Sequence, residues 1–171
     1  RFNKSCFACK DCNGIECRGK VPGMGGIGTG ESFQNNVKQI RKYRIITSYI
    51  HGIKTPDLSC DFFARKMDLP LFIAPMTGAK TNMGGMINEE NFINDTIVGA
   101  KEAGIIAMIG DGADPEKYKL GIEAIHKAGG HGIQIFKPRS SEEDILKRIR
   151  AAESANAIAV GVSVAEDDFA I

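Results

Sequence analysis

Short apolar runs alternate with amphipathic segments along the second half of the chain. Each run is nearly continuous in apolar residues, which is typical of strands that are buried on both faces. The segments between the runs repeat apolar residues at the spacing of one helix face. The predicted strands cover residues 71–76, 105–110, 132–136 and 157–164, and the predicted helices cover residues 88–104, 114–130 and 140–155. This alternation predicts parallel βαβ units.

Caps and apolar stripes support the three predicted helices. Asn88 and Asp114 stand at N-cap positions, and Ser140 with Glu143 forms a capping-box pattern. Gly104 stands where a glycine commonly ends a helix. The predicted inner stripes are Ile93, Ile97 and Ala100 in the first helix, Tyr118, Ile122 and Ile125 in the second, and Ile145 or Leu146 with Ile149 in the third.

Two architectures are compatible with this pattern, a doubly wound sheet and a (β/α)8 barrel. A complete barrel usually has eight strands in about 250 residues. The chain has 171 residues and four such strands, so as a barrel it would form about the first four βα units. In both architectures ligands bind beyond the carboxyl ends of the strands.

Three regions of the chain differ in composition and in hydrophobic pattern. Residues 1–30 are rich in Cys and Gly, residues 31–70 are mixed, and residues 71–171 carry the regular alternation. In the mixed region, residues 31–45 predict a helix, and residues 58–67 predict a hairpin that leads into the next strand. We therefore expect an N-terminal segment, a connecting region and a region of parallel βαβ units.

Composition narrows the choice of partners and location. The formal net charge is +1, which gives no basis for binding nucleic acid or a membrane surface. No apolar run approaches the roughly 18 residues of a transmembrane helix, and the first residues contain no apolar signal-peptide core. These features predict a cytoplasmic protein.

Four of the five cysteines crowd near the start of the chain, at Cys6, Cys9, Cys12 and Cys17. The odd count and the crowding argue against a secreted disulfide framework. The spacing C-x2-C-x2-C-x4-C is one residue longer in its last interval than the ferredoxin run. Short C-x2-C pairs also suit tetrahedral zinc. We predict an iron–sulfur cluster or zinc on these four thiols, with ordinary reduced cysteines as the alternative.

The loops after the predicted strands carry the candidate binding chemistry. The first two, residues 75–85 and 110–114, are rich in Gly and let a backbone approach a ligand closely. Lys137 and Arg139 add positive charge after the third strand, where an inward Gln134 amide could bond a heterocycle edge. In the alternative interpretation these loops are plain tight turns, Asp111 solvates a loop, and Gln134 satisfies a neighbouring backbone group.

The segments "CRGKVPGMGGIGTG", "LPLFIAPMTGA", "GDGADPEKY" and "IQIFKP" resemble a known family. They are similar to the clostridial-type branch of the FMN-dependent α-hydroxy-acid oxidising proteins, relatives of lactate and glycolate oxidases. The resemblance covers nearly the whole chain and is strongest at residues 17–30 and 69–85. It implies a TIM (β/α)8 barrel with FMN across the carboxyl ends of the strands, and so favours the barrel.

Carried over residue by residue, the resemblance implies a set of FMN contacts. The loop after the first strand would meet the flavin ring near its reactive nitrogen, and Gln134 would bond the pyrimidine edge of the ring. The implied FMN-binding residues are Pro75, Met76, Thr77, Gly78, Ala79, Gly110, Asp111, Gln134 and Ser163. Better-studied oxidases have a tyrosine that contacts the substrate carboxylate at the position held here by Phe136.

The resemblance also implies parts that lie beyond Ile171: a strand-five lysine, a catalytic histidine base and the phosphate-binding loops. We therefore expect an FMN-dependent oxidoreductase that oxidises a small 2-hydroxy acid, such as lactate or glycolate, by hydride transfer to flavin. A C-terminal barrel half would complete the site, and we expect a homo-oligomer. Two alternatives stay open: another FMN-barrel enzyme, such as a flavin-dependent isomerase or dehydrogenase, and a non-catalytic metal- or iron–sulfur-binding module.

Overall fold

A computed structural model describes residues 7, 9–20, 25–26, 28–79, 85, 87–112 and 117–163. The chain divides into two compact units, Arg1–Pro56 with Lys80–Met86, and Asp57–Ala79 with Ile87–Ile171. The division after Pro56 groups the predicted hairpin with the βαβ region, whereas the sequence pattern grouped the hairpin with residues 31–70.

In the first unit, helix α1 (Glu31–Ile40) follows Gly30, which has a left-handed backbone. The sequence predicted this helix to continue to residue 45, and that prediction is wrong. A short helix depends on burying an apolar stripe, but Ile45 and Ile46 are 93% and 95% exposed. Further helical turns would therefore gain no packing, and residues 43–56 form neither helix nor strand.

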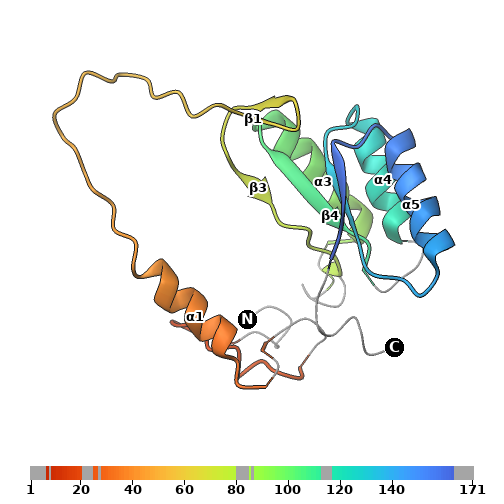
Figure 1. Cartoon of the computed structure of the whole chain (residues 1–171), viewed down its shortest axis with the longest axis horizontal. Helices are drawn as coiled ribbons and strands as arrows, with labels where there is room; N and C mark the ends of the chain where they lie inside the picture. Colours follow the sequence, from red (N-terminus) through yellow and green to blue (C-terminus); the bar gives the residue numbers. More distant parts are fainter. Residues whose placement is uncertain are drawn as a thin grey trace. The chain divides into compact units, whose positions relative to one another are not determined.

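The second unit is built around a parallel sheet whose strand order follows the chain (Figure 1). Its strands run in the order β3 (Phe72–Ile73), β4 (Ile106–Gly110), β5 (Ile133–Phe136) and β6 (Ala159–Val162). All three pairings are parallel. A doubly wound sheet reverses its strand order at a switch point, so this sequential order is of the barrel type.

Three helices cover one face of the sheet: α3 (Glu89–Glu102), α4 (Lys117–Lys127) and α5 (Glu142–Ser154). The predicted stripe of α3 is confirmed, because Ile93, Ile97 and Ala100 are buried against β4 and α4. A doubly wound sheet would carry helices on both faces. The single helical face therefore agrees with the sequential strand order.

The helix ends follow the sequence signals in part. The side chain of Asn88 accepts a hydrogen bond from the Asn91 N–H, as predicted, and Gly104 has a positive φ of 67°. At α5 the cap is Ser141, which accepts from the Asp144 N–H, so the predicted cap at Ser140 is one residue off. The predicted cap at Asp114 lies outside the described residues.

The buried stripes of α4 and α5 differ from the prediction. In α4, Tyr118 and Ile125 are buried as predicted, while Ile122 is half-buried. In α5 the fully buried residues are Arg148 and Ala152, while the predicted Ile149 is half-buried against the core, Ile145 is half-buried and Leu146 is exposed. Arg148 is buried because it faces a carboxylate that directly follows β4, described below, and that partner cannot be identified from the helix alone.

The predicted hairpin is confirmed as β1 (Cys60–Phe62) paired antiparallel with β2 (Arg65–Met67). Met67 packs with Ile106 and Ile133, which begin β4 and β5. The hairpin thus covers the amino-terminal end of the sheet face opposite the helices. The carboxyl-terminal end of that face lies beyond these contacts.

The two turn residues of the hairpin have a left-handed backbone conformation, and its cost can be tested by substitution. Phe63 and Ala64 have positive φ values of 45° and 57°, the pattern of a type I′ turn, which favours glycine. Ala64→Gly should raise the free energy of unfolding by about 0.5–1 kcal/mol, because the left-handed backbone is costly for alanine. The same change at exposed Ala103, whose φ is −82°, should lower stability by about 0.5–1 kcal/mol. Urea denaturation of both variants measures the contrast, and equal effects would contradict this account of the turn.

Candidate functional site

The inner sheet face lies opposite the helices. Gly110, Ile135 and Gly161 form a row at its carboxyl end, which we call the floor. Register places Gly110 beside Ile135 and Ile135 beside Gly161 in one row across β4, β5 and β6. Two of the three positions have no side chain, and the Ile135 side chain extends over one of them, because a Cβ atom at Gly161 would lie 2.7 Å from Ile135 Cδ1.

The loop after β3 borders this floor. A Cβ atom added at Gly110 would lie 3.0 Å from the Pro75 carbonyl oxygen and 3.3 Å from the Thr77 methyl group. Loop and strand end are therefore in close contact, and glycine at position 110 permits that approach. Met76, between the two loop residues, exposes about half of its side chain.

The same loop is held from behind by Glu89, the first residue of α3. The two oxygens of its carboxylate accept hydrogen bonds from the Gly78 and Ala79 N–H groups, each at 2.7 Å. Lys117 Nζ lies 3.5 Å from Glu89 Oε2, and both side chains are mostly buried. A carboxylate on two successive backbone N–H groups is a charge-assisted arrangement. Gly78 and Ala79 thus direct their N–H groups toward α3.

Asp111 lies directly after β4, and its side chain is fully buried. Its Oδ1 accepts from the Lys137 N–H at 2.9 Å, and its Oδ2 accepts from Arg139 Nη2 at 2.6 Å. The same Arg139 nitrogen donates to the Gly112 carbonyl at 3.2 Å. Asp111 therefore ties the end of β4 to the loop that follows β5.

A second arginine completes this charge cluster. Arg148 of α5 is 3% exposed, and its Nη1 lies 3.6 Å from Asp111 Oδ2. Its Nε donates to Asp144 Oδ2 at 3.0 Å, and its guanidinium carbon lies 4.2 Å from the centre of the Tyr118 ring. One buried and one partly exposed guanidinium group thus share one buried carboxylate, an arrangement that depends on every partner being present.

Gln134 faces the helices, which corrects the expectation that its amide points to the inner face. Register places it beside Ile109, which packs against α3 and α4. Its Nε2 donates to the Ile109 carbonyl at 3.0 Å, and its Oε1 lies against Gly121 of α4. This geometry matches the alternative interpretation, in which Gln134 satisfies a neighbouring backbone group.

The predicted FMN-binding residues thus divide into two sets. Residues 75–77, Gly110 and Ser163 lie at the open carboxyl end, and the Ser163 N–H donates to the Phe136 carbonyl at 2.8 Å. Gly78, Ala79, Asp111 and Gln134 are buried, and their polar contacts run to neighbouring loops, strands and helices. The first set can line a ligand, while the second supports the loops that do so.

Comparison with known families agrees with this arrangement. A sequence model of the family described as FMN-dependent dehydrogenase matches residues 23–166. The chain belongs to the FMN-dependent dehydrogenase family. The match includes every predicted FMN-binding residue, and no curated protein matches the chain significantly.

One solved structure with a similar fold is a doubly substituted flavocytochrome b2 with sulfite bound. Its TM-score is 0.50 at 19% sequence identity, and the match covers 68% of this chain. The matched part is 29% of the flavocytochrome chain, so this family member spans well under half the length of that protein. At this identity the likeness supports the fold.

The predicted metal site receives no support from the described part of this family member. Cys9 and Cys12 are exposed and Cys17 is partly exposed, and Cys6 lies outside the described residues. Among the described residues, no group of three or more His, Cys, Asp or Glu side chains is arranged to hold a metal ion. Iron–sulfur or zinc binding stays a prediction for the complete set of four thiols.

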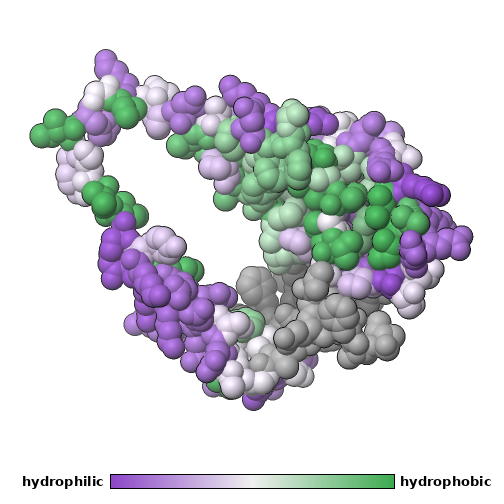
Figure 2. Space-filling model, in the orientation of Figure 1, coloured by the Kyte–Doolittle hydropathy of each residue, from purple (hydrophilic) through white to green (hydrophobic). Residues whose placement is uncertain are grey.

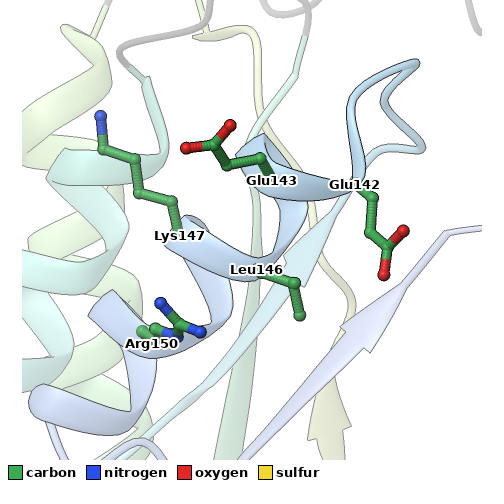
Figure 3. Close-up of a pocket in the computed structure, with 5 residues that line it drawn as sticks. All are labelled: Glu142, Glu143, Leu146, Lys147 and Arg150. Carbon is green, nitrogen blue, oxygen red and sulfur yellow. The ribbon is translucent and has the colours of Figure 1, made fainter.

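Two further observations concern the surface. Among the described residues, no helix is long and apolar enough to cross a membrane. A shallow pocket lies on α5, and all of its lining side chains come from that one helix: Glu142, Glu143, Leu146, Lys147 and Arg150 (Figure 3). The pocket includes none of the predicted FMN-binding residues.

Sequence reasoning missed three residues that shape the site: Glu89, Lys117 and Arg148. All three are charged residues in helices, where the pattern indicates a solvent-facing side chain. One signal was available for Glu89, because an acid in the first helical turn after a Gly-rich loop can accept from that loop's N–H groups. No comparable local signal marks Arg148, since its partner Asp111 lies 37 positions earlier in the chain.

Proposed function

We propose that this family member contributes the flavin-facing half of an FMN-dependent oxidoreductase that oxidises a small 2-hydroxy acid of the lactate or glycolate kind. The observation that carries the proposal is the family match over residues 23–166. The open floor at the carboxyl ends of the strands supports it, because parallel α/β folds bind ligands at that edge.

The residues at the floor fit the ring of FMN. In the row formed by Gly110, Ile135 and Gly161 only Ile135 carries a side chain, and the Pro75 carbonyl and the Thr77 side chain lie against Gly110. A planar ring requires a flat surface with a few polar groups at its edge. We infer that residues 75–77, Gly110 and Ser163 contact the ring.

In this proposal the flavin accepts the hydride, and the protein orients the reactants and excludes water. Glu89 and Asp111 hold the loops after β3 and β5, so the ring would meet preformed backbone positions. The base that removes the substrate proton would come from beyond Ile171, as the resemblance implies.

We further infer that a C-terminal barrel half pairs with β6. In the described part of the chain, β5 is the only strand paired with β6. The helix-side residues of β6, Val160 and Val162, are 38% and 48% exposed, and Leu146 of α5 is 42% exposed. Figure 2 shows hydrophobic surface in the region of β6 and α5. A further βα unit would cover these side chains.

Assembly into a homo-oligomer stays a prediction, which light scattering can measure.

The proposed function is tested by the spectrum and reduction of the complete protein. We expect purified protein to be yellow with bound flavin, and anaerobic addition of lactate or glycolate to bleach the flavin band. The control is 2-hydroxyisobutyrate, which has a hydroxyl and a carboxylate but no hydrogen on the α carbon, and so can give no hydride.

Each result has a defined meaning. Folded protein that takes up no FMN would overturn the oxidoreductase proposal. Protein that binds FMN, but whose flavin is reduced by no small 2-hydroxy acid, would favour another FMN-barrel enzyme such as an isomerase. Bleaching by 2-hydroxyisobutyrate would contradict hydride transfer from the α carbon.

A further inference from the structure

We propose that Glu89 is a positioning residue that acts as a built-in anion, fixing the loop that borders the flavin site. Its carboxylate occupies two successive backbone N–H groups, those of Gly78 and Ala79, at 2.7 Å each. The flavin part of this inference rests on the proposed function. The hydrogen bonds from Gly78 and Ala79 to the Glu89 carboxylate, which we call the clamp, do not depend on it.

The loop geometry indicates what the carboxylate supplies. Gly78 has a φ of +82°, so its backbone turns through the left-handed region and directs adjacent N–H groups to one side. Both Gly78 and Ala79 are buried. Without an acceptor, two buried backbone donors would lose their hydrogen bonds, which is costly enough to change the loop conformation.

The surrounding charges favour an anion at this point. Glu89 is the first residue of α3, where the helix dipole attracts negative charge. Lys117 of α4 lies 3.5 Å from its carboxylate. A Cβ atom at Gly112 would lie 3.6 Å from the Lys117 side chain and 3.3 Å from Thr77 Oγ1. The clamp thus joins the loops after β3 and β4.

The consequence for the site is a division of roles within one loop. The N–H groups of Gly78 and Ala79 are used by Glu89, so this pair frames the loop from behind. The Pro75 carbonyl and Thr77 side chain lie on the other side, against Gly110. Removing the carboxylate should therefore disturb Pro75–Thr77 without removing any atom that would contact the ring.

The experiment is chemical rescue of Glu89→Ala in the full chain by formate. The variant leaves a space bordered by two N–H donors and Lys117, which a small carboxylate can fill. We expect millimolar formate to raise the melting temperature of Glu89→Ala and to restore protection of the Gly78 and Ala79 amides from hydrogen exchange. Formate should change neither quantity in the wild type or in Glu90→Ala, a matched control at an exposed position of the same turn.

The flavin readout is measured separately. We expect Glu89→Ala to bind FMN about 10- to 100-fold more weakly than the wild type, the range for loss of one or two charge-assisted hydrogen bonds, and formate to recover most of that loss. Glu89→Gln keeps the shape of the side chain, but its NH2 group is a donor. One of the two backbone N–H groups would therefore face a donor and have no acceptor. This variant should therefore show an intermediate loss and no formate response, and it also serves if Glu89→Ala does not fold.

The two proposals fail in different ways. If amide exchange at Gly78 and Ala79 is equally slow in the wild type and in Glu89→Ala without formate, the clamp is overturned. If the clamp behaves as expected but FMN affinity is unchanged in Glu89→Ala, the positioning role is overturned. If the wild type binds no FMN while formate still rescues the variant's stability, the proposed function fails and the clamp stands.

Discussion

Replacing Asp111 with alanine should lower the free energy of unfolding by about 3–5 kcal/mol, the cost of breaking a buried ion pair from one side. The carboxylate is fully buried and has two arginines beside it, Arg139 at 2.6 Å and Arg148 at 3.6 Å. Without it, Arg148 keeps only Asp144 as a carboxylate partner. The Lys137 N–H also loses its acceptor.

Urea denaturation of the full chain measures this loss, with Asp144→Ala as the matched control. Asp144 contacts the same arginine, but its side chain is 38% exposed, so water can replace it and the cost should stay below about 1 kcal/mol. Asp111→Asn preserves the shape and one acceptor oxygen, and should fall between the two. A loss of under about 1 kcal/mol for Asp111→Ala would show that the cluster does not stabilise the fold.

A double-mutant cycle tests whether the cluster behaves as a unit. Arg139→Met alone should destabilise the protein, because Asp111 would lose its shortest ion-pair contact. Added to Asp111→Ala, the same change should cost much less, since Arg139 would already have lost its carboxylate partner. A coupling energy of about 1–3 kcal/mol is expected for groups in direct contact. Additive losses would contradict a shared network.

Asp111 also shows how far sequence could predict the site. Its place after an apolar strand correctly indicated the carboxyl edge of the sheet. Whether such a carboxylate meets a ligand or a buried arginine depends on Arg139 and Arg148, which approach it only through the folding of the β5–α5 segment. Arg148 in particular is a charged residue on the buried stripe of a helix, where the pattern predicts an apolar side chain.

Gln134 was placed on the wrong face for a related physical reason. A strand that is buried on both faces has no polar–apolar alternation. Its sequence therefore does not indicate which residues face the helices and which face the inner side of the sheet. In β5 three of four residues are buried, and they belong to both faces. Register with β4 and contact with Gly121 fix the orientation of the Gln134 side chain, and both depend on tertiary structure.

The overall architecture was more predictable because its signals are local. The Asn88 cap and the stripe of α3 combine a polar cap with apolar residues three or four apart, and both are confirmed. Helix α1 shows the limit of such signals. Its apolar positions continue past Ile40, but Tyr43, Ile45 and Ile46 are 81%, 93% and 95% exposed among the described residues.

Gly121→Ala should destabilise the protein by about 1–3 kcal/mol, although alanine is the better helix former. Gly121 lies within α4. An added Cβ atom there would overlap Oε1 of Gln134 and lie 3.0 Å from the Ile109 side chain. Both neighbours are fully buried, and forcing one methyl group into a packed core costs about that much.

Gly99→Ala is the matched control, because Gly99 lies within α3 and a Cβ atom there would meet nothing within 4 Å. Free of clashes, this change should stabilise the protein by up to about 1 kcal/mol through helix propensity alone. The two substitutions are chemically identical, so opposite signs in urea denaturation would isolate the packing against Gln134. A stabilising Gly121→Ala would mean that Gln134 moves away easily.

The source of the Gly121 clash can be tested by shortening its neighbour. Gln134→Ala removes the Oε1 atom and should itself be destabilising, since it deletes a buried side chain and its hydrogen bond to the Ile109 carbonyl. In that background Gly121→Ala should cost far less than alone, because the new methyl group enters the vacated space. If Gly121→Ala costs the same in both backgrounds, Ile109 and not Gln134 makes glycine necessary at this position.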